Sequence, residues 1–311
     1  MTSAPGKLFL IGEYAVLYGG AATLVPVPQR AFATLKRDGR NRLITHLSET
    51  SETALPIPGE LTGGLLFDAV IAELACSDQL KNVSLTLDTH QFFSNGVKLG
   101  LGSSAALTAA LVRLLVPDVT LRQQLELAIS CHRRFQSGRG SGADIALSIM
   151  DTPIAFMPGE TPQAVRLPNN LKMLAIWTGV SASTTDYLHR LEAWRQEDEV
   201  RADFHIDRLK DLSTTFNRTS SADEMVSLLH RYDRYLDEFS GESRLNFYNE
   251  PHIALQKEVE LARCVYKPSG AGGGDFGIAF STDENDLIIL AEKLKEGGRT
   301  AFFLQESGGR E

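Results

Sequence analysis

Three glycine-rich segments constrain this chain more than any other feature of its sequence. The first reads Lys98-Leu-Gly-Leu-Gly-Ser-Ser-Ala-Ala106 and runs into the apolar, alanine-rich stretch Ser103–Leu115, which predicts a buried helix. Glycines let the backbone approach a ligand closely, and the start of a helix offers unpaired N–H groups and the positive end of its dipole. The hydroxyls of Ser103 and Ser104 can cap the helix or contact a phosphate or its magnesium ion. We therefore interpret this segment as a phosphate-binding loop.

Other interpretations of the same loop fit less well. Gly100-Leu-Gly-Ser-Ser-Ala105 satisfies the G-x-G-x-x-A pattern of dinucleotide folds, and Asp118 lies 18 residues on from Gly100. Asp118, however, follows Pro117 at the end of a predicted helix, and a ribose would be held from the tip of a second parallel strand. The Gly-Lys-Ser/Thr of a Walker loop is missing from this segment. A purely structural glycine turn remains open from this segment alone.

The second segment, Gly138-Arg-Gly-Ser-Gly-Ala-Asp-Ile-Ala146, also has the composition of a turn that enters a helix. Asp144 would lie in the first helical turn, where the helix dipole favours a carboxylate and where a bound phosphate would be close. An Asp in this position is commonly only a helix-start residue. The three alternating glycines and the neighbouring Arg139 favour a functional role instead.

The third segment, Lys267-Pro-Ser-Gly-Ala-Gly-Gly-Gly-Asp-Phe-Gly277, has five glycines among the eight residues 270–277. A flexible linker has a similar composition. This segment, however, runs straight into the apolar strand Ile278–Phe280, with Asp275 in between. We therefore expect a backbone loop that closes over an anion.

The balance of charge excludes a general polyanion-binding protein. Lys and Arg number 31 and Asp and Glu number 39, so the formal net charge is 31 − 39 = −8. A chain this acidic is not suited to coat nucleic acid or an anionic membrane, and it can bind an anion only by concentrating positive field locally.

Membrane and export signals are missing from the sequence. No stretch reaches the ~18 uninterrupted apolar residues of a membrane helix. The apolar run Leu8–Ile11 is interrupted by Glu13 too early for a secretory signal. The spacing of Cys76, Cys131 and Cys264 matches neither a disulfide framework nor a zinc site, so we expect them to be small buried residues. These features predict a cytoplasmic protein.

Strand and helix patterns alternate along the chain and predict two α+β domains. Turn residues and a change of composition at 150–170 place the division near residue 155, which gives domains 1–155 and 156–311. The predicted helices are Leu61–Cys76, Ser103–Leu115, Leu121–Phe135, Thr184–Arg195, Glu197–Phe216, Ala222–Phe239 (with Ser221 as its cap) and Glu284–Leu294. The predicted strands are Lys7–Ile11, Arg30–Lys36, Val83–Leu87, Leu171–Trp177, Gly277–Phe280 and Thr300–Leu304.

Three motifs, which span nearly the whole chain, resemble those of the GHMP kinases, the superfamily of galactokinase, homoserine kinase, mevalonate kinase and phosphomevalonate kinase. Ala4-Pro-Gly-Lys-Leu-Phe-Leu-Ile-Gly-Glu-Tyr-Ala-Val-Leu17 is similar to their first motif. Gly100–Ala106 is similar to their ATP-phosphate loop, and Lys267–Gly277 to their third motif. The resemblance implies a two-domain fold, with an N-terminal ATP-binding domain like domain 2 of ribosomal protein S5 and a ferredoxin-like C-terminal domain.

Within this superfamily, several details are most similar to the phosphomevalonate kinase family. Tyr14 follows Gly12-Glu13 where mevalonate kinases usually carry His, and Lys98 precedes the phosphate loop. Trp177-Thr-Gly-Val-Ser-Ala-Ser-Thr184 resembles the family's W-T-G-x-x-A-S-T segment, and Lys267–Gly277 resembles its K-x-S-G-A-G-G-G-D-x-G.

The resemblance also implies roles for individual residues. Asp144 matches the Asp that contacts the acceptor and is proposed as a base, and Lys7 matches the Lys that pairs with this Asp and steadies the transferring phosphoryl group. Ser104 matches the serine near magnesium. The residues implied in ATP binding are Lys98, Gly100, Leu101, Gly102, Ser103, Ser104, Ala105, Gly270, Ala271, Gly272 and Gly273. The residues implied in acceptor binding are Glu13, Tyr14, His132, Arg139 and Ser141.

One position departs from the mevalonate kinase pattern. Those enzymes use a Glu some 11 residues before the catalytic Asp as a second magnesium ligand, whereas position 133 here is Arg, between His132 and Arg134. This change removes a carboxylate ligand and adds positive charge, which suits an acceptor that already bears a phosphate. The alternative is that these side chains form a solvated face of the helix.

The function that the resemblance implies is Mg2+-dependent transfer of a phosphoryl group from ATP to 5-phosphomevalonate, in the mevalonate pathway of isoprenoid biosynthesis. The nearest alternative is mevalonate kinase or another small-molecule GHMP kinase. A decarboxylase of phosphorylated mevalonates and a GHMP-fold sensor without turnover also stay open. The expected partner is a small phosphorylated substrate, and neither nucleic acid nor a membrane is expected to bind. The sequence makes no prediction of the oligomeric state.

Overall fold

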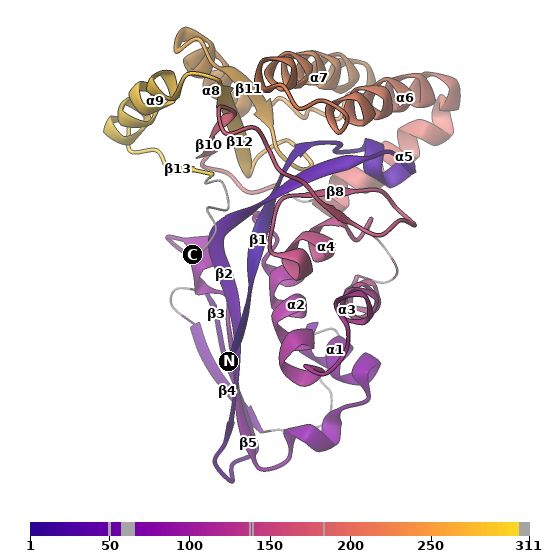
Figure 1. Cartoon of the computed structure of the whole chain (residues 1–311), viewed down its shortest axis with the longest axis vertical. Coiled ribbons are helices and arrows are strands. Elements are labelled where there is room, and N and C mark those ends of the chain that lie inside the picture. The colour runs from indigo at the N-terminus through magenta and orange to yellow at the C-terminus, as the bar shows by residue number, and fades with distance from the viewer. Residues whose placement is uncertain (49–50, 57–65, 137, 139, 183, 305–311) are drawn as a thin grey trace. The chain divides into compact units, whose positions relative to one another are not determined.

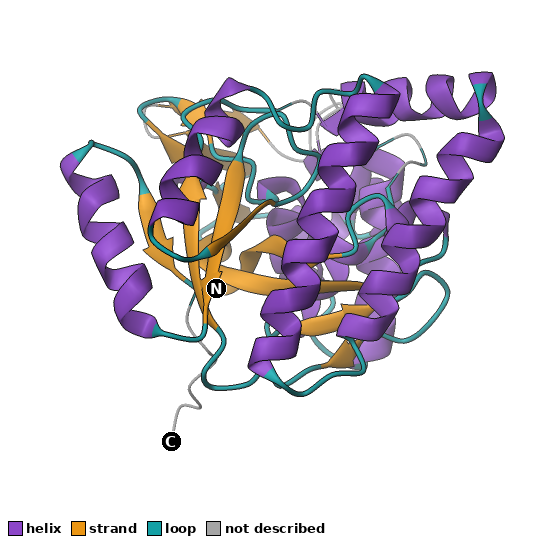
Figure 2. Cartoon of the chain, turned by 90° about the horizontal axis from the view of Figure 1, so that it is seen from above, coloured by secondary structure: helices purple, strands orange, loops and turns teal. Residues whose placement is uncertain are grey.

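The computed structural model of the 311-residue chain describes residues 1–48, 51–56, 66–136, 138, 140–182 and 184–304. Helices and strands are mixed along the described chain, which confirms the predicted α+β class (Figures 1 and 2). The chain divides into two compact units. The first unit is Met1–Lys7 with Pro26–Asp151, and the second is Leu8–Val25 with Thr152–Glu311. The division into domains 1–155 and 156–311 stays a prediction.

In the first unit, a sheet in the order β4-β3-β5-β2 provides one layer. The strands β5 (Val83–Asp88) and β3 (Arg42–Ser48) are parallel, and the other two pairings in this order are antiparallel. The remaining strands here are β4 (Ser51–Pro56), β2 (Ala22–Arg37) and β1 (Thr2–Ile11), and β1 pairs with β2. The division between the units falls within both β1 and β2, so only Thr2–Lys7 and Pro26–Arg37 belong to the first unit. Ala31 and Ala33 of β2 are fully buried, as their alternation with larger or polar neighbours predicts.

Four helices of the first unit contact one another: α1 (Leu66–Leu74), α2 (Ser103–Leu115), α3 (Leu121–Phe135) and α4 (Ala143–Met150). Ten of the 13 residues of α2 are buried, because the helix is apolar all round. Helix α3 begins with a capping box in which Thr120 and Gln123 satisfy each other's backbone N–H. The short elements are η2 (Ser77–Leu80), η3 (His90–Phe92), β6 (Phe93–Ser94) and β7 (Val97–Lys98).

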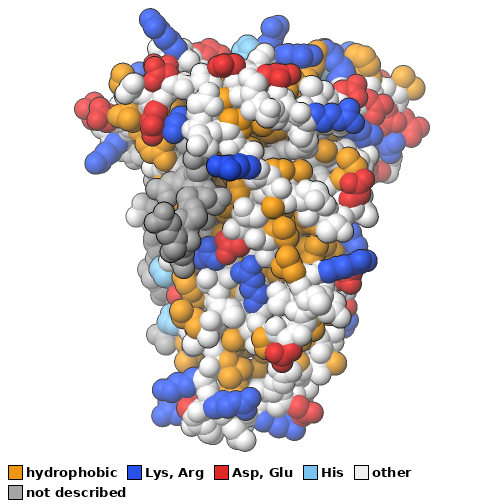
Figure 3. Space-filling model, in the orientation of Figure 1, with side chains coloured by type: hydrophobic (Ala, Val, Ile, Leu, Met, Phe, Trp, Pro, Cys, Tyr) orange, Lys and Arg blue, Asp and Glu red, His pale blue; other side chains and the backbone are white. Residues whose placement is uncertain are grey.

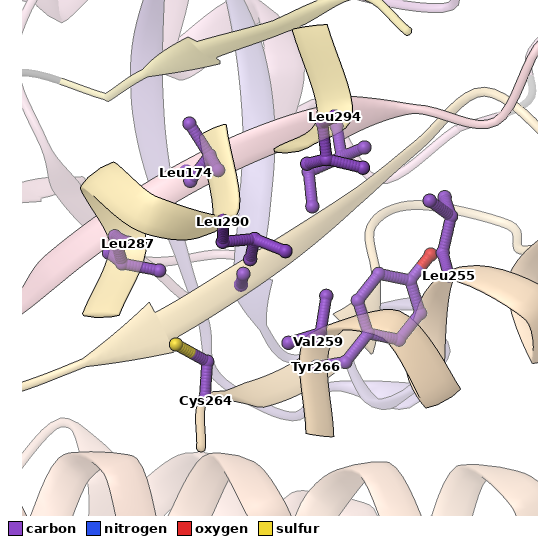
Figure 4. Close-up of a cluster of buried hydrophobic side chains, with 10 residues drawn as sticks. Leu174, Leu255, Val259, Cys264, Tyr266, Leu287, Leu290 and Leu294 are labelled. Carbon is purple, nitrogen blue, oxygen red and sulfur yellow. The ribbon is translucent and has the colours of Figure 1, made fainter. Parts of the chain in front are cut away.

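The second unit contains an antiparallel four-stranded sheet in the order β11-β12-β10-β13. Its strands are β10 (Lys172–Trp177), β11 (Val265–Pro268), β12 (Phe276–Ser281) and β13 (Ala301–Phe303). The helices α8 (Glu250–Leu261) and α9 (Glu284–Glu296) pack on this sheet. Their apolar side chains meet strand residues such as Leu174 and Tyr266 in a buried core (Figure 4).

Three further helices of the second unit lie between β10 and α8 in the chain. They are α5 (Thr184–Glu197), α6 (Glu199–Phe216) and α7 (Ala222–Ser243), and α6 contacts both α5 and α7. Ser221 caps α7 by accepting a hydrogen bond from the N–H of Glu224, as predicted. The remaining elements are η1 (Ala15–Tyr18), β8 (Ile154–Phe156), which pairs with Ala22–Leu24 of β2, and β9 (Gln163–Ala164).

The surface and the cysteines agree with the sequence. Acidic and basic side chains are interspersed on the face shown in Figure 3. Cys76, Cys131 and Cys264 are free thiols and buried. Among the described residues, no helix has both the length and the apolar character that crossing a membrane requires.

Candidate active site

The predicted phosphate loop ends at an uncapped helix start. Gly102 is the N-cap residue of α2, with a left-handed φ of 81°, and as a glycine it supplies no side-chain cap to the start of the helix. The first intrahelical bond runs from the N–H of Ala106 to the carbonyl of Gly102, at 3.0 Å. The preceding N–H groups of Ser103, Ser104 and Ala105 therefore have no carbonyl of their own helix to bind. Such a helix start attracts an anion.

Lys7 lies directly against this loop. Its backbone N–H donates a 2.9 Å hydrogen bond to the carbonyl of Leu101. A Cβ atom built on Gly102 would lie 3.2 Å from Cε and 3.3 Å from Cγ of Lys7. The positive φ of Gly102 favours glycine, and a side chain there would also crowd the Lys7 side chain that crosses it. Strand β1 therefore brings the predicted catalytic lysine beside the start of α2.

A second group of polar side chains lies at the same helix start. Nε2 of His132, in the last turn of α3, lies 3.2 Å from Oγ of Ser104. His132 is buried, and burial lowers the pKa of its imidazole, while the nearby Asp144 carboxylate acts in the opposite direction. The structure therefore brings together His132, Ser104 and Asp144, three residues that the sequence assigned to acceptor, metal and catalysis.

Helix α4 places Asp144 at its first turn. Gly142 is the N-cap residue, with φ 87°, and Oγ of Ser141 accepts a 3.2 Å hydrogen bond from the N–H of Ala143. Asp144 is half-buried and remains close enough to the surface to reach a ligand. Arg139, which was predicted to bind the acceptor, lies outside the described residues.

Two basic residues beside these motifs are exposed. Lys98 lies on β7, in a hairpin with β6 that turns through Asn95-Gly96, both with positive φ. Arg133, next to the buried His132, is exposed on α3. The structure therefore directs His132, and not Arg133, towards Ser104.

In the second unit, the third glycine segment is a loop held on several sides. The N–H of Gly273 donates to the carbonyl of Phe247 at 2.7 Å, and Nδ2 of Asn249 donates to the carbonyl of Gly273 at 2.8 Å. A Cβ atom on Gly273 would lie 1.6 Å from the hydroxyl oxygen of Tyr187, so only glycine fits there. Oδ1 of Asp275 accepts from the N–H of Ala182 at 3.0 Å. The segment is thus a fixed loop and not a flexible linker.

A buried ion pair ties this loop to Glu13 of the first motif. Lys267 is 0 % exposed and Glu13 is 3 % exposed, and Nζ of Lys267 donates to Oε1 of Glu13. The same Nζ donates to the carbonyl of Pro268 at 2.6 Å, and the N–H of Gly270 lies 3.4 Å from Glu13 Oε1. The hydroxyl of the buried Tyr14 donates to the carbonyl of Ala271. Glu13 and Tyr14 therefore both contact the residues that carry the loop.

Further buried polar groups surround this pair, and the sequence did not indicate them. Burial raises the pKa of Asp233 to about 7, although a hydrogen bond from Tyr248 and the Lys267 charge act in the opposite direction. Burial lowers the pKa of His252 to about 4, and its Nε2 lies 3.0 Å from the carbonyl of Gly274. The sequence also gave no sign that Tyr187 and Asn249 contact the glycine loop, because the loop is far from both residues in sequence. Lys267 alone had a signal, because it directly precedes the loop.

The predicted site residues divide between the two units. The first unit holds Lys7, Lys98, Gly100, Leu101, Gly102, Ser103, Ser104, Ala105, His132, Ser141 and Asp144, and the second holds Glu13, Tyr14, Gly270, Ala271, Gly272 and Gly273.

The donor atoms fit magnesium bound together with a nucleotide. Within the part of the chain that the structure describes, no group of three or more His, Cys, Asp or Glu side chains could hold a metal ion by itself. The hydroxyl of Ser104 and the carboxylate of Asp144 supply hard oxygen donors near the helix start. Magnesium commonly takes one or two protein oxygens and completes its shell with phosphates and water.

Several known proteins are similar to this chain. Residues 70–152 match the GHMP kinases N terminal domain. A phosphomevalonate kinase of Saccharolobus solfataricus is 28 % identical over 99 % of this chain and 97 % of its own length. A mevalonate kinase of Archaeoglobus fulgidus is 24 % identical over 96 % of this chain and 99 % of its own length.

The fold matches as well. A Streptococcus pneumoniae phosphomevalonate kinase, solved with phosphomevalonate and AMPPNP, superposes with a TM-score of 0.78 at 20 % identity, over 97 % of this chain and 98 % of that one. This likeness shows a shared fold along nearly the full length. By sequence motif and by these matches, the chain contains a region similar to the GHMP kinases N terminal domain, resembles that superfamily along its length, and is a phosphotransferase of the kinase type.

Proposed function

We infer that this protein transfers the γ-phosphoryl group of ATP to the phosphate of 5-phosphomevalonate, which gives 5-diphosphomevalonate and ADP. The observation that carries the phosphoryl-transfer chemistry is the group of side chains at the uncapped start of α2. Lys7 crosses Gly102 there, and His132 contacts Ser104 with the Asp144 charge nearby. A lysine, a hydroxyl, a carboxylate and free helix N–H groups are the parts that such a transfer needs.

In this proposal each part has a distinct role. The N–H groups of Ser103, Ser104 and Ala105 bind phosphate oxygens of ATP, and Nζ of Lys7 neutralises charge on the transferring group. A magnesium ion at this place would withdraw charge from the nucleotide phosphates. Ser104 and Asp144 are the residues that would hold it.

The acceptor attacks without the help of a base. A phosphate monoester has a second pKa near 6 and is largely a dianion at neutral pH. One of its oxygens forms the new bond to the γ-phosphorus, while the bond from that phosphorus to the bridging oxygen breaks and ADP leaves with the electron pair. No proton needs to move, so Asp144 orients Lys7 and the metal instead of removing a proton. A hydroxyl acceptor would need the base.

The choice of acceptor rests on sequence. The relative from S. solfataricus, similar over its full length, is a phosphomevalonate kinase. The local details that resemble the same family, Tyr14 and the segment Trp177–Thr184, support the choice. The similarity to an archaeal mevalonate kinase favours mevalonate as the second candidate acceptor.

A coupled ADP-release assay tests the proposal. The purified enzyme is supplied with ATP and Mg2+ and with mevalonate, 5-phosphomevalonate, homoserine or galactose in turn. We expect a strong response to 5-phosphomevalonate and a diphosphate product by 31P NMR. A response to mevalonate alone would transfer the proposal to mevalonate kinase. Release of carbon dioxide with phosphate would indicate the decarboxylase, and silence with all four acceptors would refute the kinase proposal for these acceptors.

A further inference from the structure

His132 is a buried histidine whose contact with Ser104 the phosphoryl-transfer mechanism does not yet use. It lies on the buried face of α3 together with Leu125, Ala128 and Cys131, where a polar side chain is costly unless it is hydrogen-bonded. The described contact of its ring nitrogen is Nε2 to Oγ of Ser104, at 3.2 Å. The imidazole is therefore held at the one hydroxyl that faces the metal in the proposed mechanism.

We propose that His132 is a positioning residue: its Nε2 accepts the hydroxyl proton of Ser104 and so turns the oxygen lone pairs of Ser104 towards the magnesium ion. This inference rests on the proposed use of Mg-nucleotide and is independent of which acceptor the enzyme takes.

The position of Ser104 in its helix explains why the hydroxyl needs this partner. A serine or threonine inside a helix commonly donates its hydroxyl proton to the carbonyl four residues earlier. Thr108 does so, with a 2.8 Å bond to the carbonyl of Ser104. Ser104 lies in the first turn, and the residue four positions earlier, Gly100, is in the loop with a left-handed φ of 74°. The hydroxyl of Ser104 thus has no helical carbonyl at the usual place.

The direction of the hydrogen bond decides what Ser104 can do. A hydroxyl has one proton and two lone pairs, and a neutral imidazole has one donor and one acceptor nitrogen. If Nε2 donated to Ser104, one lone pair would be used and the hydroxyl proton would be left free to point at the cation. If Nε2 accepts, the proton is bound on the protein side, and the lone pairs are available to the metal. Side chains that orient a metal ligand in this way commonly change metal affinity by ~10- to 100-fold.

The first test reads the direction of the bond in the ligand-free enzyme. Two-dimensional NMR of protein labelled with 15N-histidine distinguishes the Nδ1–H from the Nε2–H tautomer, and the spectrum of His132→Gln assigns the signal. We expect His132 as the Nδ1–H tautomer, with Nε2 free of a proton. An Nε2–H tautomer at His132 would overturn the inference, whatever the enzyme's substrate proves to be.

The second test reads metal affinity without turnover. Binding of Mn2+ in the presence of ADP is measured by electron paramagnetic resonance for wild type, His132→Leu and His132→Gln. We expect about a 10-fold or greater loss of Mn2+ affinity for leucine, and recovery of much of it for glutamine, whose amide oxygen can accept the same proton. In a Ser104→Ala background, His132→Leu should have no further effect. Equal affinity for wild type and His132→Leu would refute the inference.

A matched control separates positioning from folding. His205 is equally buried, at 3 % exposed against 4 % for His132, and lies in the second unit with its Nε2 2.8 Å from Glu242. His205→Leu removes a buried imidazole whose described hydrogen-bond partner is Glu242, so it should leave Mn2+ affinity unchanged. If it lowered the affinity as much as His132→Leu does, the effect would be structural and the inference would fail. Should His132→Leu not fold, the NMR result on wild type decides.

Discussion

Removal of one partner of the Glu13–Lys267 ion pair tests the central contact of the second unit. In Lys267→Met, the side chain keeps much of its volume and loses its charge, while the Glu13 carboxylate stays buried. Glu13 has lost the ammonium that compensates it, and its Oε2 is already buried without a hydrogen-bond partner among the residues that the structure describes. The variant also loses the donor to the carbonyl of Pro268 and the cation 5.6 Å from the ring centroid of Tyr232.

The size of the effect follows from this burial. Breaking a buried ion pair by removal of one partner costs about 3–5 kcal/mol, because an uncompensated charge is left behind. For a unit of this size, that loss lowers the melting temperature by on the order of 10 °C. Glu13→Gln should cost a similar amount, since it leaves the Lys267 ammonium unpaired. The double variant Glu13→Gln/Lys267→Met buries no charge. Its loss of unfolding free energy should therefore be smaller than the sum of the two single losses, by at least ~2 kcal/mol.

Urea unfolding followed by circular dichroism, together with thermal melts, measures these free energies for the four proteins of the cycle. Lys293→Met serves as the control, because Lys293 is exposed on α9 and its replacement should change stability by less than ~0.5 kcal/mol. Single losses that simply add in the double variant would show that the two charges do not interact. A loss below ~1 kcal/mol for Lys267→Met would show that its ammonium does not compensate Glu13.

Other expected outcomes concern the transfer site, its phosphate loop and a buried carboxyl group. Asp144→Asn and Lys7→Met should each lower kcat for ADP release by on the order of 10²-fold or more, since each removes a charge from the transfer site, and near-normal turnover in either would remove it from that site. Gly102→Ala should raise the KM for ATP and destabilise the first unit by about 1 kcal/mol or more, because its Cβ would crowd Lys7 and its φ is positive. Gly39→Ala is the control, since Gly39 has a similar positive φ of 75° and open space around it. This control should lower stability in unfolding experiments without changing the KM. Asp233 should make the stability of the wild type fall as the pH rises. Its pKa is raised to about 7 in the folded state against about 3.9 in the unfolded state, so the folded protein binds the proton more tightly. The resulting contribution to the free energy of unfolding is complete below pH 4 and is lost as the pH rises to about 7. Relative to Asp233→Asn, the wild type should lose about 4 kcal/mol of unfolding free energy between pH 4 and pH 8, and parallel pH profiles for the two proteins would contradict the raised pKa.

Much of the local structure could be predicted from sequence because it depends on nearby residues. Helices α2 and α3 have the predicted bounds, since apolar periodicity and cap residues act within a few positions. The helix Glu250–Leu261 was not predicted. The sequence did contain a signal for it, since Asn249 caps the helix and Pro251 lies in its first turn. Strand β2 is longer than the predicted Arg30–Lys36. It begins at Ala22, and the added part contains two prolines, which are unusual within a strand. These prolines lie between the part of β2 that pairs with β8 and the part that pairs with β5. Neither of these two pairings therefore loses a hydrogen bond because proline has no N–H.

Contacts between distant segments could not be predicted in the same way. The motif around Ser104 indicates a phosphate loop, but nothing near it in sequence places the His132 ring nitrogen at its hydroxyl, 28 residues away. The basic run of α3 offered three candidate side chains, and only tertiary packing decides that the histidine is buried and Arg133 is exposed. The amphipathic pattern of α3 does contain this information in part, because Leu125, Ala128 and His132 share one face at helical spacing.

Glu13 and Tyr14 show how far a motif can be interpreted without the fold. The resemblance implied that both residues bind the acceptor, and this assignment stays a prediction. Their side chains, however, are buried, and the described partners are Lys267 for Glu13 and the carbonyl of Ala271 for Tyr14. Such contacts fix the glycine loop, which must keep one conformation if its N–H groups are to bind an anion. A net charge of −8 is compatible with anion binding, because the N–H groups of glycine loops and helix starts supply positive field without formal charge. The Lys267 ammonium does not add to this field, because Glu13 compensates its charge inside the protein.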